Sequence, residues 1–293
     1  MSALCCLLEV VLVLAAVHCM GRSSLRIAAT VVLLVGAIAL PFFLPGRPIM
    51  RALASALSLL ALVKVLRVGE DPARWPARLR TWHALAPFDV DKATAAAPGL
   101  DRRLLGWTLL HAVIALGALA LLFALPRGLP FWMQALRLLL GGAVVYGGME
   151  AIAGALRLGH RLAGIEIPPL QDRPLLSLSI REFWNRRWNL AVSGWLDAFV
   201  FVPVATRRGA TVGLLAAFAA SGLLHAWVFL ASVGWIAAIS AGLFFVFQGF
   251  FVLVESFVDI RKASNGLRRM WTLGLLALSS PLFVDPVLRV FGV

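Results

Sequence analysis

Long apolar runs separated by short polar connections dominate the chain. A helix of about 20 apolar residues is long enough to cross the ~30 Å hydrocarbon core of a bilayer. Windows of that kind stand at residues 3–20, 25–44, 49–66, 104–125, 130–156, 210–233, 234–257 and 270–291. None shows the alternation of a membrane-spanning strand, and a helix satisfies its own backbone hydrogen bonds in lipid. The pattern therefore predicts an all-α fold, a polytopic membrane helical bundle with about eight transmembrane helices.

Composition and charge fit this prediction. The 293 residues are 61% hydrophobic and only 14% charged, whereas soluble domains carry roughly 25% charged residues. The net charge of +13 comes from Lys and Arg in the connections, at 22–26, 67–103, 157–187, 207–208 and 261–269. The positive-inside rule places these connections in the cytoplasm and the N-terminus outside. The basic charge is thus explained by membrane topology, and we expect membrane lipids and no nucleic acid as partners.

This topology holds only if residues 183–206 do not cross the membrane, and their apolar part is too short to span. We therefore expect 167–206 to be cytoplasmic, interfacial or re-entrant. The first segment has no positive N-terminal region and contains Glu9, so we expect a retained anchor rather than a cleaved leader. The abundance of Ala, Arg, Gly and Leu favours a GC-rich bacterial source, and hence a bacterial inner membrane.

The longest polar insertion, 69–103, has its own pattern. Its apolar positions recur at helical spacing, with arginines 74, 78 and 80 between them; they are Trp75, Leu79, Trp82 and Leu85. This spacing predicts an amphipathic helix on the cytoplasmic membrane surface. We expect a single membrane-embedded domain, 1–293, in which N-terminal helices (1–68) and the insertion (69–103) precede the helices of 104–293. Its catalytic core is expected at about 174–260.

A second polar segment, 157–181, ends at the stretch "REFWNRRWN", residues 181–189. Prolines 168, 169 and 174 forbid a continuous helix before it. Ser179 or Ser177 is the expected N-cap, and Glu182 completes a capping box with Ser179. We expect the stretch to begin a helix at the membrane surface that continues past Asn189, with one aromatic and one polar face.

Several enzyme classes find no support in the motifs. The chain has no G-x-S-x-G, no G-x-x-x-x-G-K-[ST], no H-E-x-x-H and no C-x-x-C, which argues against hydrolases, NTPases and zinc enzymes. The three cysteines, Cys5, Cys6 and Cys19, share one predicted helix and are expected to act as small hydrophobic residues. We expect no metal and no cofactor.

A few ionisable side chains stand inside predicted spans, where they are costly unless they face a cavity or a partner. His225 is one; Ser221, one turn earlier, could orient its imidazole, which would then act as a general base toward a hydroxyl. A buried histidine that only bridges helices explains the position as well, and His111 is equivalent on these grounds. Glu150 is expected to pair with an arginine such as Arg137 or Arg157.

The order of two motifs decides between these alternatives. "FWNRRWN" (183–189) followed by "SGLLH" (221–225) resembles the membrane-bound O-acyltransferase family, in particular its wax synthase branch. The close match covers about residues 174–230. The resemblance implies that His225 is the base and Asn189 the second catalytic residue, and that Trp184, Arg187 and Trp188 belong to the substrate site. Ala226 departs from the pattern, since this branch often has Glu there.

The resemblance implies transfer of an acyl group from acyl-CoA, as a co-substrate, to the hydroxyl of a lipophilic alcohol. Arg186 and neighbouring arginines (181, 187, 207 and 208) are candidates for the CoA phosphates, and Ser221 lies beside the base. Asn189 would bind the acyl carbonyl or its oxyanion. Two other functions stay open: acetyl or short-chain transfer to a lipid, terpenoid or sugar hydroxyl, and a non-catalytic membrane carrier or scaffold.

Overall fold

The computed structural model describes residues 2–126 and 130–293, without the side chains of 2–6, 131 and 132. The side chains of Cys5 and Cys6 therefore lie outside the described part. The helices are α1 (Ser2–Cys19), α2 (Ser24–Phe43), α3 (Pro48–Glu70), α4 (Ala77–Leu85), α5 (Arg102–Ala124), α6 (Phe131–Leu162), α7 (Ile180–Glu182), α8 (Leu190–Leu196), α9 (Val202–Arg208), α10 (Ala210–Ser232), α11 (Trp235–Val258), α12 (Asn265–Ser279) and α13 (Pro281–Phe291). The expected all-α architecture is confirmed, apart from two short strands.

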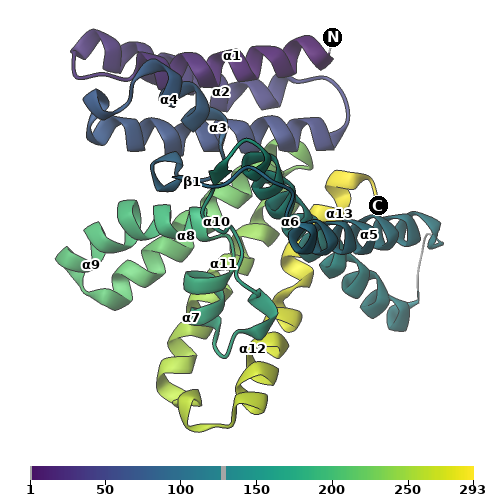
Figure 1. Ribbon diagram of the computed structural model, residues 1–293. Coiled ribbons are helices and arrows are strands. Elements are labelled where there is room, and N and C mark those ends of the chain that lie inside the picture. The colour runs from purple at the N-terminus through teal and green to yellow at the C-terminus, as the bar shows by residue number, and fades with distance from the viewer. Residues whose placement is uncertain (1, 127–129) are drawn as a thin grey trace.

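Two groups of helices lie beside a central pair. Helices α1, α2 and α3 lie side by side at the top of Figure 1, and α5 pairs with α6 on the right. Helices α10 and α11 pack along each other in the centre, and α13 contacts both α11 and α6. This arrangement brings α6, α10, α11 and α13 together from distant parts of the sequence.

The lengths of the helices agree with the predicted spans. Among the described residues, seven helices are long and apolar enough to cross a membrane. The α12–α13 pair is bent by 53° and passes the same test as one broken span, and the apolar part of α1 (Leu7–Cys19) is shorter. The protein is thus an integral, multi-pass membrane protein.

One premise about the spans is wrong, because the apolar part of residues 183–206 is not too short to span. Residues 190–208 form a single 19-residue run of helix, through α8, a π-helical turn (Asp197–Phe201) and α9, and this run is long and apolar enough to span. Pro203 lacks an N–H and breaks regular hydrogen bonding within a helix. Here it follows a π-helical turn, a local change in hydrogen-bond spacing that lets the helix continue. The segment packs along α10 at the periphery of the bundle.

The 69–103 insertion is docked on the protein. Arg80, expected on a solvated face, is almost fully buried in α4 and donates to carbonyl oxygens of Trp75, Pro72, His18 and Met20 at 2.7–2.9 Å. Trp75 is buried, whereas Leu85 is exposed. The amphipathic pattern therefore predicted the helix but not its orientation, because the end of α1 supplies acceptors that sequence spacing does not show.

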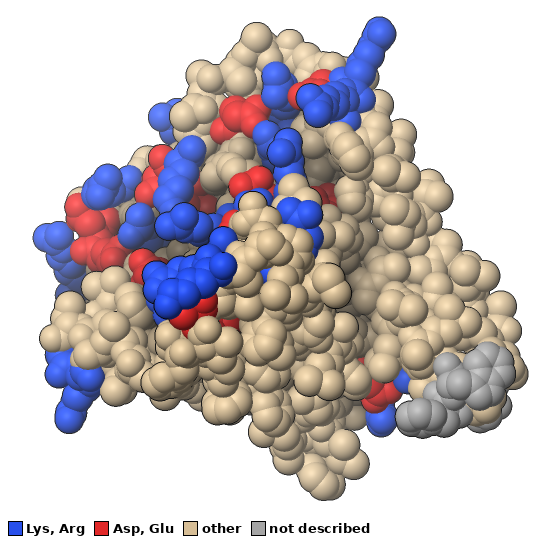
Figure 2. Space-filling view, turned by 90° about the horizontal axis from the view of Figure 1, so that it is seen from below, with Lys and Arg blue, Asp and Glu red and all other residues tan. Residues whose placement is uncertain are grey.

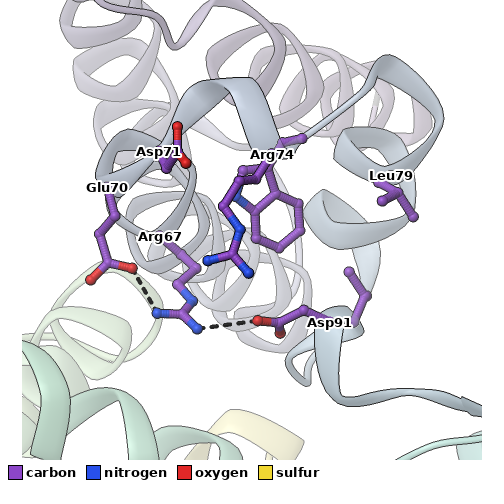
Figure 3. Close-up of a pocket in the computed structure, with 8 residues that line it drawn as sticks. Arg67, Glu70, Asp71, Arg74, Leu79 and Asp91 are labelled. Atoms are coloured by element: carbon purple, nitrogen blue, oxygen red, sulfur yellow. Dashed lines mark hydrogen bonds and ion pairs between the residues drawn. The ribbon is translucent and has the colours of Figure 1, made fainter.

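The insertion is fixed to the end of α3 by charge. The Arg67 guanidinium bridges Glu70, at 2.6 Å, and Asp91, at 3.2 Å, as the dashed lines in Figure 3 show. Further along, β1 (Thr94–Ala95) pairs antiparallel with β2 (Ile165–Glu166), with Thr94 opposite Glu166. This small sheet ties the insertion to the segment that follows α6.

Charged side chains are unevenly distributed over the molecule. In the view of Figure 2, Lys, Arg, Asp and Glu gather over one part of the face, and most of the remaining surface is of other residue types. Many large apolar side chains elsewhere are exposed, such as Leu25, Val32 and Phe257. Exposed apolar helices with charges confined to the ends of the bundle fit a protein surrounded by lipid.

Candidate active site

The stretch that carries the first motif is anchored at its start by two carboxylates. Ser179 is the N-cap, as predicted, and accepts a hydrogen bond from the Glu182 N–H at 2.9 Å. Glu182 in turn accepts from the Leu178 N–H at 2.9 Å. The buried Glu255 of α11 accepts from the Ile180 N–H at 2.7 Å. The motif therefore begins at a fixed point against the end of α11.

The motif is not one regular helix, contrary to expectation. Residues Phe183–Arg187 form a π-helical turn, Trp188 is extended, and Asn189 has a φ of +43° before α8 begins. Asparagine tolerates this left-handed conformation better than most residues. The break changes the direction of the chain between Trp188 and α8, so that the side chains of 184, 185, 188 and 189 all reach one cavity.

His225 lies on α10 with a defined hydrogen bond. Its Nδ1 is 2.8 Å from the carbonyl oxygen of Ser221, one turn earlier. A carbonyl oxygen only accepts, so Nδ1 carries the proton and Nε2 of the neutral ring keeps a lone pair. The ring stacks on Phe245, with centroids 4.2 Å apart. Within the described residues nothing bonds Nε2. Ser221 thus orients the imidazole as expected, but through its main chain rather than its hydroxyl.

A cavity of about 590 Å³ joins these residues, within the range of roughly 300–1,000 Å³ typical of small-molecule sites. It lies between α6, the motif, α10, α11, α12 and α13. Of the predicted site residues it brings together His225, Asn189, Trp184, Trp188 and Ser221. The rest of the wall is mainly apolar, including Phe244, Phe283 and Val287. The side-chain amide of Asn189 bonds none of the described residues and is available to a ligand.

The structure places two predicted site residues away from the cavity wall. Arg187 is held by Glu182, at 2.7 Å, and by the carbonyl of Asp172, at 3.1 Å, so it joins the motif to the preceding loop. Burial would raise the pKa of Glu182, but the N–H of Leu178 and the Arg187 guanidinium outweigh it and hold this pKa below its usual value. Arg186 is exposed. The arginine that lines the cavity is Arg181.

Sequence reasoning missed a residue that positions Trp184. The indole N–H of Trp184 donates to Gln248 Oε1 at 3.2 Å, and Gln248 Nε2 donates to Ser279 Oγ at 2.8 Å. Gln248 is fully buried in α11. A lone amide in an apolar helix, "FVFQGF", is the signal that could have found it, because an intramembrane polar side chain needs a partner.

The predicted arginine partners of Glu150 are wrong. Arg137 pairs with Asp285 at 2.8 Å and Arg157 pairs with Glu166 at 2.8 Å. Glu150 instead interacts with Tyr146, one turn earlier on α6, and with His111 of α5. Tyr146 lines the cavity, and its ring stacks near Trp188. Glu150 and His111 therefore stand behind the cavity wall.

The cavity offers no evident cation site. Among the described residues no group of three or more His, Cys, Asp or Glu side chains is placed to hold a metal ion. Ala226, where a carboxylate was considered, is not part of the cavity wall and packs against α11 beside Gly242. A longer side chain there would point at α11. The cavity wall instead offers the Nε2 lone pair of His225, the side-chain amide of Asn189 and the guanidinium of Arg181.

Comparison with known proteins finds similarity over the segment that carries both motifs. The profile of the membrane bound O-acyl transferase family matches residues 167–247. The chain is 28% identical over 144 residues to a probable long-chain-alcohol O-fatty-acyltransferase 3 of Arabidopsis thaliana, covering 43% of this chain and 41% of the relative. It is 31% identical over 127 residues to the long-chain-alcohol O-fatty-acyltransferase of Simmondsia chinensis, covering 41% and 36%.

A third relative widens the comparison. An acyl-CoA–sterol O-acyltransferase 1 of Arabidopsis thaliana is 28% identical over 130 residues, covering 42% of this chain and 37% of the relative. The chain thus spans about two fifths of the length of the curated relatives that it matches. The matching segment contains both motifs and most of the cavity wall contributed by α8 and α10. Over residues 167–247 the chain is thus similar to the membrane bound O-acyl transferase family, and the relatives named above are long-chain-alcohol and sterol O-acyltransferases.

Proposed function

We propose that the protein is an O-acyltransferase that moves an acyl group from acyl-CoA to the hydroxyl of a lipophilic alcohol and forms an ester. The observation that carries the proposal is the lone pair of His225 Nε2, fixed by the Ser221 carbonyl and placed in an apolar cavity with the free Asn189 amide. Relatives named for long-chain alcohols and for a sterol support a lipophilic acceptor.

The residues suit each part of the reaction. The alcohol oxygen attacks the thioester carbonyl while His225 Nε2 takes the hydroxyl proton. The Asn189 amide donates to the oxyanion that develops on the carbonyl oxygen, a contribution of a few kcal/mol in comparable sites. The C–S bond then breaks, and the imidazolium returns the proton to the leaving thiolate, which gives the ester and free CoA. A thioester needs no further activation, so the proposed reaction uses no metal or cofactor.

The two halves of acyl-CoA have matching surroundings. The anionic head suits Arg181 in the cavity wall, because guanidinium binds phosphate oxygens in a bidentate manner. The acyl chain suits the apolar wall. The substrate roles of Trp184 and Trp188 fit their place in this wall, whereas those of Arg186 and Arg187 stay predictions. The single-domain organisation and a bacterial inner membrane also stay predictions, and the relatives named above are plant proteins.

The test is release of CoA thiol by the purified protein in detergent. Palmitoyl-CoA or acetyl-CoA is supplied with and without hexadecanol, a sterol and a sugar, which separates long-chain from short-chain transfer. Alcohol-dependent release that disappears in His225→Ala is expected. His18→Ala, at a partly exposed histidine of α1 that does not line the cavity, is the matched control. Release that His225→Ala retains would contradict the proposed base, and no release with any pair would favour a carrier or scaffold.

A further inference from the structure

Helix α6 contains two glycine doublets, Gly141–Gly142 and Gly147–Gly148. The first glycine of each doublet is needed for packing. A Cβ at Gly141 would overlap Val284 Cγ1 of α13, and a Cβ at Gly147 would lie 2.9 Å from the carbonyl oxygen of His111 on α5. Small residues of this kind let membrane helices approach closely. The first glycines therefore hold α6 against α13 and α5.

The second glycine of each doublet has a different environment. A Cβ at Gly142 or Gly148 would meet no atom within 4 Å, and both residues line the 590 Å³ cavity. Any side chain at these two positions would project into the cavity. The absence of a side chain there is therefore not required by packing, and it leaves volume in the substrate site.

The α6 wall is long and, apart from Tyr146, apolar. It runs from Gly142 to Ile152 and includes Val145 and Met149. Ten residues of helix rise roughly 15 Å, enough for an extended alkyl chain of medium to long length. Gly142 lies beside Gly141, which touches α13, and the cavity wall also includes Phe291 of α13 and Arg181 of α7.

We propose that Gly142 and Gly148 determine the length of the alkyl chain that the cavity accepts, with the chain lying along α6. The proposal rests on the proposed function and adds its specificity. A side chain at Gly142 removes space near α13 and shortens the chain that fits. Gly148 lies six residues closer to the end of α6 that carries the arginines. A side chain there removes space nearer to that end, so only a still shorter chain fits.

The test compares Gly142→Leu and Gly148→Leu with Gly159→Leu. Gly159 is the matched control, because it lies on the same helix, has no atom within 4 Å of a built Cβ and does not line the cavity. Leucine favours a helix more than glycine, so all three variants are expected to fold. Gly142→Ala gives a smaller step at the same position.

Two substrate series are measured with each variant. One runs from palmitoyl-CoA to octanoyl-CoA with a fixed alcohol, and the other from hexadecanol to octanol with a fixed donor. Each methylene that loses its place in the cavity costs about fourfold. Gly142→Leu is therefore expected to lower kcat/KM at least about tenfold for the longest chain in one series, with little change for the shortest. The series that responds identifies which chain lies along α6.

A binding measurement separates this proposal from the proposed function. Hexadecanol and octanol compete with a fluorescent fatty acid for the protein in detergent, without any turnover. Stronger competition by hexadecanol in the wild type, lost in Gly142→Leu, would support the length determinant even if no transfer occurs. Unchanged length profiles in both Gly142→Leu and Gly148→Leu, or an equal shift in Gly159→Leu, would overturn it.

Discussion

Replacement of Arg80 by methionine tests how the 69–103 insertion is held. The Arg80 side chain is almost fully buried and donates four hydrogen bonds of 2.7–2.9 Å to main-chain carbonyls. Two of these carbonyls, His18 and Met20, belong to the end of α1, where a positive charge is also favoured by the helix dipole. Methionine keeps most of the apolar stem but leaves these acceptors without a donor.

The magnitude follows from the hydrogen bonds. Bonds to a charged group contribute about 1.5–3 kcal/mol each, but losses from truncating one partner of a buried charged network cluster at about 3–5 kcal/mol. Because folded proteins are stable by roughly 5–15 kcal/mol, Arg80→Met should fold but unfold about 10 °C lower. Burial and the nearby Arg26 lower the pKa of Arg80, yet a guanidinium stays protonated in proteins, so the effect should not depend on pH.

The assay is thermal unfolding of the purified protein in one detergent, followed by tryptophan fluorescence. Arg78→Met is the matched control, since Arg78 is exposed on the same helix. Arg80→Lys should be intermediate, because one ammonium group cannot reach all four carbonyls. Equal unfolding temperatures for Arg80→Met and Arg78→Met would refute the reasoning, and would mean that the insertion is held by its apolar contacts alone.

Three further outcomes are expected. Gln248→Leu leaves the Trp184 indole N–H without its acceptor, so it should lower the free energy of unfolding by about 1–3 kcal/mol. It should also raise KM more than His18→Ala does. Unchanged kinetics would exclude a positioning role for Gln248. Asn189→Gly keeps the left-handed backbone and removes only the amide, so kcat should fall about 10²–10³-fold in a well-folded protein; wild-type kcat would exclude it from catalysis. Burial, and then the nearby Lys64, lower the pKa of His83 to about 3, so between pH 6.5 and 5 only the unfolded chain binds this proton. The free energy of unfolding measured with a denaturant should therefore be about 2 kcal/mol lower at pH 5 than at neutral pH. His83→Phe should reduce this loss. A loss that stays the same in His83→Phe would come from another group.

The main elements of the fold could be predicted because lipid imposes a simple rule on sequence. Runs of apolar residues long enough to span a bilayer had to become helices, and the predicted windows match helices such as α2 and α11. The Ser179 cap was also predictable, because it depends on residues within one turn. The position of His225 in an apolar run pointed to a cavity for the same energetic reason.

Other features depend on partners that are remote in sequence. Arg187 follows the motif, but its ion pair with Glu182 and its bond to Asp172 arise from the loop before it. Arg80 had the spacing of a solvated residue, and two of its four main-chain acceptors, His18 and Met20, lie about 60 positions away at the end of α1. The π-helical turn at 183–187 has no established residue signature, so a regular helix was expected in its place.

The bond between His225 and the Ser221 carbonyl has a consequence for mutational robustness. In many enzymes a second side chain orients the base, so mutation of either residue can abolish activity. Here the acceptor is a main-chain atom that every amino acid possesses, and the helix itself supplies it at the right distance. Substitutions at position 221 that preserve α10 therefore leave the tautomer of His225 intact. If His225 is the base, as proposed, the mutations that disable it are reduced to those of the histidine codon and those that break the helix.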